Sequence, residues 1–233
     1  ALRAGDWEAY AEAQARLEAA IQRAVDASPD GGSVEIDPGR PGPALIAELA
    51  ATARELARHG RGELLGAGVG MPGPVDPEEG VYRGSASSAD AWAGAPIRAL
   101  LLEELALPVH PDHDPRAALV GESWSQPGLL DNAALVLADE GLGASLRLDG
   151  AMVRGAHSQA GEIGHTVVRL DGLPCPCGRR GCAQEEYLAA AAAGDQALAA
   201  RVLASVVLDL VRLVDVDRVV LGGRSVYTHH RAT

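Results

Sequence analysis

The chain has 233 residues, with 32 acidic and 20 basic side chains, which gives a formal net charge of −12. This length allows one large domain or two modest ones, and it excludes a small scaffold held together only by disulfides. A negative surface repels phosphate backbones, so the chain alone is not expected to bind nucleic acid. No apolar run reaches the roughly 18 residues that a bilayer span needs. No secretion signal opens the sequence, so we expect a cytoplasmic protein.

The first 42 residues are expected to form a helix followed by a linker. Apolar residues recur at helical spacing from Asp6 to about Val25, which predicts an amphipathic helix. It either packs on its own domain or serves as a connector or dimerisation helix. Residues 28–42 are rich in Pro and Gly, as linkers are. We therefore assign residues 1–30 to a connector, 31–117 to an N-terminal α/β domain and 118–233 to a C-terminal α/β domain.

Helical and strand patterns alternate through the next segment. Helices are predicted over residues 43–59, 96–105 and 115–124, and strands over residues 64–70 and 107–110. This alternation is typical of an α/β protein.

The C-terminal half is predicted to open with an antiparallel meander. Strands over residues 135–138 and 144–148 are followed by Asp149-Gly150, a strong hairpin signal. Further on, Gly194-Asp195 can cap a helix that extends to about Val214. A strand over residues 218–221 then ends at Gly222-Gly223.

All three cysteines lie between residues 175 and 182, which indicates a metal site or a reactive thiol instead of a disulfide framework. Together with His165, the thiolates of Cys175, Cys177 and Cys182 form the four-ligand set that Zn²⁺ prefers. Because four protein ligands leave no position for a catalytic water, the predicted zinc ion is structural. The alternative is a group of buried free thiols beside an unrelated His.

Several motifs resemble those of the ROK family of repressors and sugar kinases. The two most specific are Gly-Glu-Ile-Gly-His at residues 161–165 and Cys-Pro-Cys-Gly-Arg-Arg-Gly-Cys at residues 175–182. Weaker matches follow in the family's order between about residues 64 and 223, at residues 68–76, 113–122, 141–144 and 219–223. The resemblance implies an actin-like, ribonuclease-H-like ATPase fold of two α/β domains with a sugar between them. We expect this fold to be incomplete at both ends of the chain, and we expect a dimer.

The resemblance also assigns roles to individual residues. Asp114 matches the general base of the kinases, and Glu162 and His165 match residues that contact the sugar, with His165 also binding zinc. His113 and Ser88 stand where the family usually has Asn. A second sugar-binding Glu is common where this chain has Gln184 and Glu185. For these last four, an ordinary structural role is the alternative.

Departures from the kinase pattern distinguish a regulator from an enzyme. No Asp-x-Gly-Gly-Thr phosphate loop occurs in the sequence. The second phosphate turn, usually Gly-Thr-Gly, reads Asp139-Glu140-Gly141, so the nucleotide site formed with Gly222 and Gly223 is degenerate. Each like-charge pair at 4 Å costs about 1 kcal/mol in water and about 4 kcal/mol near a protein surface. Nucleotide binding should therefore be poor.

We accordingly expect the effector-sensing body of a ROK-type transcriptional regulator, which binds a sugar or sugar derivative and contains a structural zinc ion. It would contact operator DNA only through a module outside this chain, and it would have no membrane partner. One alternative is an ATP-dependent sugar kinase with Asp114 as the base. A second is a zinc-stabilised oligomerisation module without a ligand.

Overall fold

The computed structural model describes residues 42–59, 65–84 and 92–223 of the chain. The helix predicted near residues 6–25, the linker up to residue 41 and the candidate Ser88 lie outside these residues. The chain forms two compact units, one with residues Ala1–Ala67 and Arg98–His110, the other with Gly68–Ile97 and Pro111–Thr233. The domain boundaries expected near residues 30 and 117 stay a prediction.

The first unit contains α2 (Gly42–His59) and most of α3 (Ile97–Leu105), which confirms both predicted helices. Arg54 of α2 donates hydrogen bonds to the backbone carbonyl and the carboxylate of Glu104 at the end of α3. Among the described residues of this unit, the buried apolar side chains are those of Ile46, Ala50, Leu101 and Val109.

Two predicted strands occur, but each begins later than expected. They are β1 (Ala67–Met71) and β4 (Val109–His113), which pair in a two-stranded sheet. The amide of Ala67 donates to the carbonyl of Pro108 at 2.8 Å. This bond lies just before β4, which begins at Val109 and contains Pro111. It continues to His113, so a predicted site residue lies at the end of this strand.

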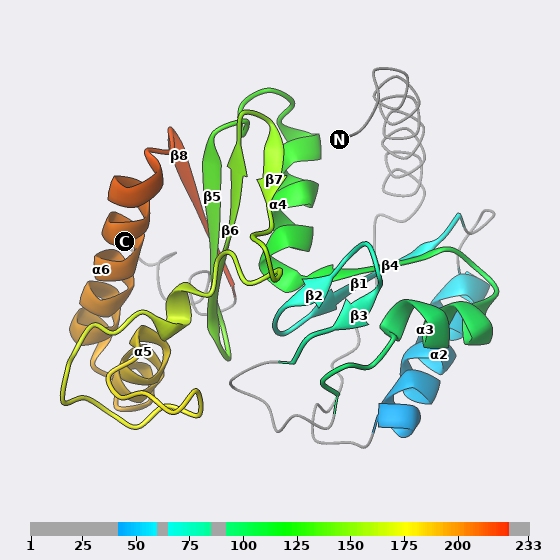
Figure 1. Ribbon diagram of the computed structural model, residues 1–233, viewed down its shortest axis with the longest axis horizontal. Helices are drawn as coiled ribbons and strands as arrows, with labels where there is room; N and C mark the ends of the chain where they lie inside the picture. Colours follow the sequence, from blue (N-terminus) through cyan, green and yellow to red (C-terminus); the bar gives the residue numbers. More distant parts are fainter. Residues whose placement is uncertain (1–41, 60–64, 85–91, 224–233) are drawn as a thin grey trace. The chain divides into compact units, whose positions relative to one another are not determined.

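The second unit is built on a four-stranded sheet (Figure 1). Its strand order is β7 (Ala151–Val153), β6 (Leu142–Leu148), β5 (Ala133–Ala138) and β8 (Arg218–Gly222). The pairs β5–β6 and β6–β7 are antiparallel, which confirms the predicted meander, whereas β8 is parallel to β5. Asp149 and Gly150 have φ of 49° and 75°, the left-handed values that a tight hairpin turn requires.

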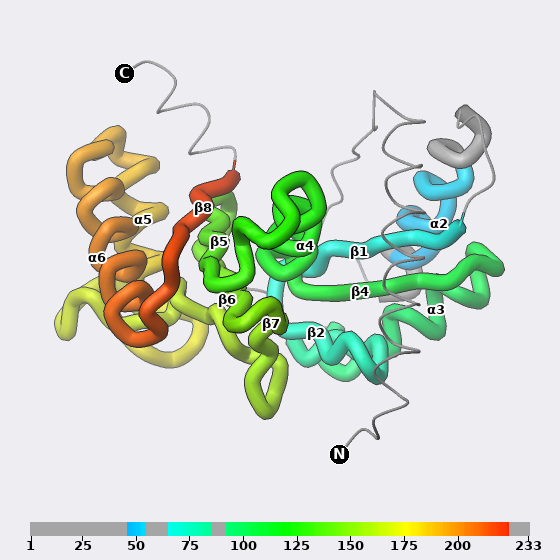
Figure 2. The backbone as a smooth tube through the Cα atoms, turned by 90° about the horizontal axis from the view of Figure 1, so that it is seen from above, coloured from blue at the N-terminus to red at the C-terminus, as the bar shows by residue number. Residues whose placement is uncertain are grey.

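Helices cover both faces of this sheet (Figures 1 and 2). One face packs against α4 (Asp114–Ser125), and the other against α5 (Ala183–Ala192) and α6 (Gln196–Val214). The side chain of Asp195 caps α6 by accepting a hydrogen bond from the amide of Leu198 at 2.9 Å, as predicted. Among the described residues, no helix combines the length and the apolar character needed to cross a bilayer.

A short hairpin and a single helical turn complete the second unit. The hairpin joins β2 (Val75–Asp76) to β3 (Val81–Tyr82), and the turn is the 3₁₀ helix η1 (Ile163–His165). Neither was predicted, because two or three residues are too few to show a hydrophobic period. In the hairpin, the carboxylate of Asp76 accepts hydrogen bonds from the amides of Glu78 and Glu79 at 3.0 and 3.1 Å.

Candidate functional site

The candidate site lies where β4 runs into α4. His113 is the last residue of β4, and its extended backbone precedes the helix that begins at Asp114. Pro115 favours the start of a helix at this point, because its fixed φ suits the first turn and its missing N–H would have no helical partner. The predicted pair His113 and Asp114 therefore stands at a helix N-terminus, where a carboxylate is favoured.

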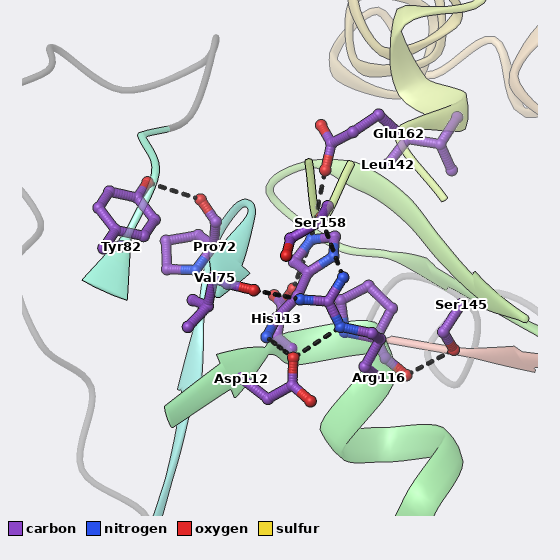
Figure 3. A network of polar contacts seen from close by, with 12 residues as sticks. Pro72, Val75, Tyr82, Asp112, His113, Arg116, Leu142, Ser145, Ser158 and Glu162 are labelled. Carbon is purple, nitrogen blue, oxygen red and sulfur yellow. Dashed lines mark hydrogen bonds and ion pairs between the residues drawn. The ribbon is translucent and has the colours of Figure 1, made fainter. Parts of the chain in front are cut away.

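His113 lies near two carboxylates, one from α4 and one from the segment before η1. Its Nε2 lies 3.3 Å from Oδ1 of Asp114. It also lies 3.7 Å from Oε1 of Glu162, which Figure 3 shows. His113 is only 4% exposed, and its Nδ1 and the Oε1 of Glu162 are buried with no hydrogen-bond partner. Buried polar atoms are normally satisfied, so these two atoms mark a place where a ligand's polar groups could bind.

The charges at this site influence one another. Burial and, to a smaller extent, the charge of Arg116 together lower the pKa of His113 to about 4, so the imidazole is neutral near pH 7. Burial raises the pKa of Asp114 to about 7, with added repulsion from Glu162 and Asp139. Because 48% of the Asp114 side chain is exposed, water screens part of this effect. Burial also raises the pKa of Glu162, while Arg116 opposes that rise.

Arg116 holds together three segments around the site, a role that was not predicted from the sequence. Its side chain is fully buried and donates to the carboxylate of Asp112 at 2.6 Å (Figure 3). It also donates to the backbone carbonyls of Ser158 at 3.1 Å and Val75 at 2.8 Å. Arginine is almost never fully buried unless it is paired, so composition alone gave no signal. The spacing along the chain gave no signal either, because Asp112 lies in β4 and Arg116 in α4, and their contact depends on the turn between the two elements.

Close backbone packing brings Glu162 and His113 together. Gly161 has φ of +99°, and a Cβ there would lie 1.9 Å from the carbonyl oxygen of Ala144. The carbonyl of Gly161 in turn accepts a hydrogen bond from the amide of Ala144 at 2.8 Å. At Gly143, a Cβ would lie 3.1 Å from Cγ of Pro115 and 3.7 Å from the ring of His113. These glycines allow β6 to contact both the His113–Pro115 corner and the segment that carries Glu162.

The four predicted metal ligands gather at one point. Nδ1 of His165 lies 3.4 Å from Sγ of Cys175, and Sγ of Cys177 lies 3.6 Å from Sγ of Cys182. All four ligand atoms lie within 4.8 Å of one another. Tetrahedral zinc with ordinary bond lengths would hold such atoms about 3.6–3.8 Å apart. The donor set and its spacing therefore fit a metal ion.

The segment that carries these ligands has no regular strand pairing and is held by single β-bridges and single hydrogen bonds. Two β-bridges occur in it, Val167 with Cys182 and Pro174 with Arg180. The buried carboxylate of Glu186 accepts a hydrogen bond from the amide of Leu173 at 2.7 Å. The sequence analysis proposed roles for the neighbouring Gln184 and Glu185 but not for Glu186. The side chain of Glu186 is buried because α5 begins at Ala183, which sets the face of the helix on which this residue lies.

The other predicted residues occupy a second corner of the same unit. Oε1 of the buried Gln184 accepts a hydrogen bond from the amide of Leu142 at 3.1 Å, so this side chain supports the turn at residues 139–141. Its Nε2 donates to Glu185 at 3.4 Å. Gly222 pairs with Leu137, and a Cβ on Gly223 would lie 2.3 Å from the carbonyl of Ala138. The two turns predicted to flank a nucleotide are therefore adjacent.

Comparison with known proteins links the chain to both repressors and kinases. The model of the ROK family matches residues 39–199. A xylose repressor from Caldicellulosiruptor bescii is 32% identical over 120 residues, which are 51% of this chain and 30% of that protein. A glucokinase from Halalkalibacterium halodurans is 35% identical over 147 residues, which are 60% of this chain and 44% of that protein. The match thus spans less than half the length of either relative.

A solved structure supports the fold. The crystal structure of a ROK family glucokinase from Streptomyces griseus, in complex with glucose and AMPPNP, matches with a TM-score of 0.69 at 21% identity. The match covers 82% of this chain and 74% of that one. At this level of identity the likeness shows the fold alone, which confirms the predicted actin-like α/β class.

Proposed function

Since this chain belongs to the ROK family, we propose that it is the sugar-sensing body of a transcriptional regulator. The proposal is supported chiefly by the acidic turn at residues 139–141. Asp139 is close enough to Asp114 to raise the pKa of that carboxyl by repulsion. The phosphates of a bound nucleotide would meet the same negative charge. Two like charges about 4 Å apart repel each other by about 4 kcal/mol at the effective dielectric of a protein surface.

A sugar or sugar derivative is the proposed effector. Its hydroxyl groups can donate to the carboxylates of Asp114 and Glu162, and a ligand group that reaches Oε1 of Glu162 or Nδ1 of His113 would satisfy an atom that has no partner. Sugar binding would act on operator DNA allosterically, by favouring one of two conformations of a dimeric regulator. The DNA contacts themselves would come from a module outside this chain.

We assign zinc to His165, Cys175, Cys177 and Cys182. Bound there, the ion would supply structural cross-linking and no open coordination position for a reacting water. His165 belongs to η1, which follows directly on Glu162. The ligand set would thereby hold the segment that carries a sugar-binding carboxylate.

The competing function is an ATP-dependent sugar kinase. One observation favours it: the pKa of Asp114 is raised to about 7, which suits a general base that removes a proton from a sugar hydroxyl near neutral pH. The glucokinase relative is consistent with the same chemistry. The zinc-stabilised oligomerisation module remains a candidate only if no sugar binds.

An ATP-consumption assay over a panel of hexoses and amino sugars, run beside calorimetric titration of the same sugars, separates these functions. The sensing proposal expects heat of binding from at least one sugar and no sugar-dependent ATP turnover. A known glucokinase, assayed in parallel, is the positive control for ATP consumption. Turnover that Asp114→Asn abolishes would establish the kinase and refute the sensor.

A further inference from the structure

We infer that the cysteine cluster is a site of oxidative modification, in which hydrogen peroxide oxidises Cys177 and a disulfide then forms between Cys177 and Cys182. The disulfide itself is argued from the arrangement of the three thiols. Its consequence, the release of a metal ion, rests on the proposed zinc assignment. Neither depends on the proposed sugar sensing.

The three thiols differ in their exposure to solvent. Cys175 is 7% exposed and Cys182 is completely buried, whereas Cys177 is partly exposed. Cys177 lies in the turn of residues 175–178, which is closed by a 2.9 Å hydrogen bond from the amide of Gly178 to the carbonyl of Cys175. Because the oxidation of thiols follows their exposure, peroxide in solution should react with Cys177 first.

Cys182 is the better placed of the two possible partners. Its Sγ lies 3.6 Å from Sγ of Cys177, so the sulfurs must approach by about 1.6 Å to reach the disulfide bond length of about 2.0 Å. Cys175 is separated from Cys177 by Pro176 alone, so a disulfide between these two would have to close around one residue whose φ is fixed. Four residues separate Cys177 from Cys182, and two of them are glycines, so this loop can adjust more easily.

The oxidation consumes one molecule of hydrogen peroxide. The Cys177 thiolate attacks one peroxide oxygen, so that an S–O bond forms, the O–O bond breaks and the leaving hydroxide takes up a proton. The Cys182 thiolate then attacks the sulfur of the resulting sulfenic acid, so that an S–S bond forms and the hydroxyl group leaves as water. In total, two thiols lose two electrons and two protons, and the peroxide is reduced to two molecules of water.

The disulfide would remove two of the four proposed zinc ligands. His165 and Cys175 would remain, with Nδ1 and Sγ 3.4 Å apart, but a structural zinc site needs four protein ligands. His165 belongs to η1, and Cys182 immediately precedes α5. Oxidation would therefore release the metal ion and with it a cross-link between these two elements.

Disulfide mapping after peroxide treatment tests the inference. The remaining thiols are alkylated, and the protein is digested with trypsin without reduction. Trypsin places Cys175 and Cys177 in one peptide, residues 170–179, and Cys182 in another, residues 181–201. We expect mass spectrometry to find these peptides joined, with fragmentation placing the bond at Cys177 and the alkyl group at Cys175. A zinc-sensitive dye should record the release of about one zinc ion per chain at the same rate.

Two matched variants each remove one ligand of the cluster. Cys175→Ser keeps both partners of the disulfide, so peroxide should still produce the joined peptides. Cys177→Ser should lower the yield of joined peptides about tenfold or more, because the two remaining thiols are buried. Mapping in the unaltered protein identifies the bonded cysteines even if a variant does not fold.

The outcomes separate the modification from the zinc assignment. A bond within the peptide of residues 170–179, or oxidation of Cys177 without any disulfide, overturns the inference. A disulfide that leaves the zinc ion bound, or equal yields of joined peptides from the two variants, also overturns it. Purified protein that contains no zinc but forms the same disulfide would confirm the modification site and refute the zinc assignment.

Discussion

Arg116 connects three parts of the candidate site through one buried side chain. Its guanidinium reaches the carboxylate of Asp112 in β4, the carbonyl of Val75 in β2 and the carbonyl of Ser158 ahead of Glu162. A fixed planar group with several donors can satisfy all of these acceptors at once, which the single ammonium of a lysine cannot do with the same geometry. The precise placement of Glu162 opposite His113 therefore depends on this residue.

Replacing Arg116 tests this dependence. We expect Arg116→Met to lower the free energy of unfolding by about 3–5 kcal/mol, because the carboxylate of Asp112 loses its cationic partner and two buried carbonyls lose a donor. Arg116→Lys should cost less, because it keeps the charge and some of the donors. Urea titration measures both. The control is Arg83→Met, which breaks exposed ion pairs with Asp76 and Glu79 and should have a small effect. Equal effects of the Met substitutions at residues 116 and 83 would contradict this role.

Asp114 makes stability depend on pH. Folding raises its pKa from 3.8 to about 7, so the folded state loses stability as the pH rises through this window. Full burial would make this loss about 4 kcal/mol, and the 48% exposure of the side chain reduces it to about 1–2 kcal/mol. Asp114→Asn should therefore raise the free energy of unfolding at pH 8 and leave it nearly unchanged at pH 4. A gain of equal size at both pH values would contradict a raised pKa.

The sequence predicted those helices and strands that have a hydrophobic period or a strong local signal such as a cap or a hairpin turn. The helices α2, α3, α4 and α6 and the strands β5 and β6 appear within a few residues of their predicted bounds, and β7 follows the hairpin signal of Asp149-Gly150. In α6 the reason is local, because Asp195 caps the first turn. The hairpin β2–β3 was missed because its strands have two residues each, and their pairing is stabilised by contacts with distant segments such as the one from Arg116 to Val75.

The sequence predicted the part of the site whose residues lie close together along the chain. The spacing of Cys175, Cys177 and Cys182 after His165 was sufficient for the metal cluster. The pairing of His113 with Glu162 was not, because 49 positions separate them and their approach depends on close packing at Gly143 and Gly161. Buried polar residues such as Arg116 and Glu186 were missed for a similar reason, since their partners become visible only in the folded chain.

Metal removal should loosen the segment between η1 and α5. Residues 166–182 have no helix and are held by turns and single backbone hydrogen bonds, such as the one from the amide of Gly181 to the carbonyl of Leu173, so a metal ion would add a cross-link between η1 and the start of α5. Trypsin cleaves after arginine, and Arg169, Arg179 and Arg180 are exposed in this segment. We expect a chelator to accelerate cleavage there selectively, as mass spectrometry of early fragments would reveal. His165→Ala should act in the same way without a chelator, whereas His157→Ala, at an exposed position outside the cluster, should not. Unchanged early cleavage after verified metal loss would refute the structural role.

At the scale of the whole molecule, a sugar sensor and a sugar kinase would differ in the charges at one edge of the sheet. The turns at residues 139–141 and 222–223 follow neighbouring strands, since Leu137 of β5 pairs with Gly222 of β8. The side chains of Asp139 and Glu140 add negative charge at this edge of a chain whose net charge is already −12. Sugar and nucleotide should therefore affect the stability of the protein very differently.

Thermal denaturation with each ligand measures this difference. A sugar at 100 times its Kd should stabilise the protein by about 2.7 kcal/mol, which raises the Tm of a chain of this size by about 5–10 °C. Magnesium-ATP should produce no shift at millimolar concentration. The double variant Asp139→Gly, Glu140→Thr removes both carboxylates from the turn that lies beside Gly222 and should gain a nucleotide-dependent shift, because the repulsion of the phosphates is gone. An ATP shift in the unaltered protein as large as that of the sugar would mean that the acidic turn does not exclude nucleotide, and it would favour the kinase.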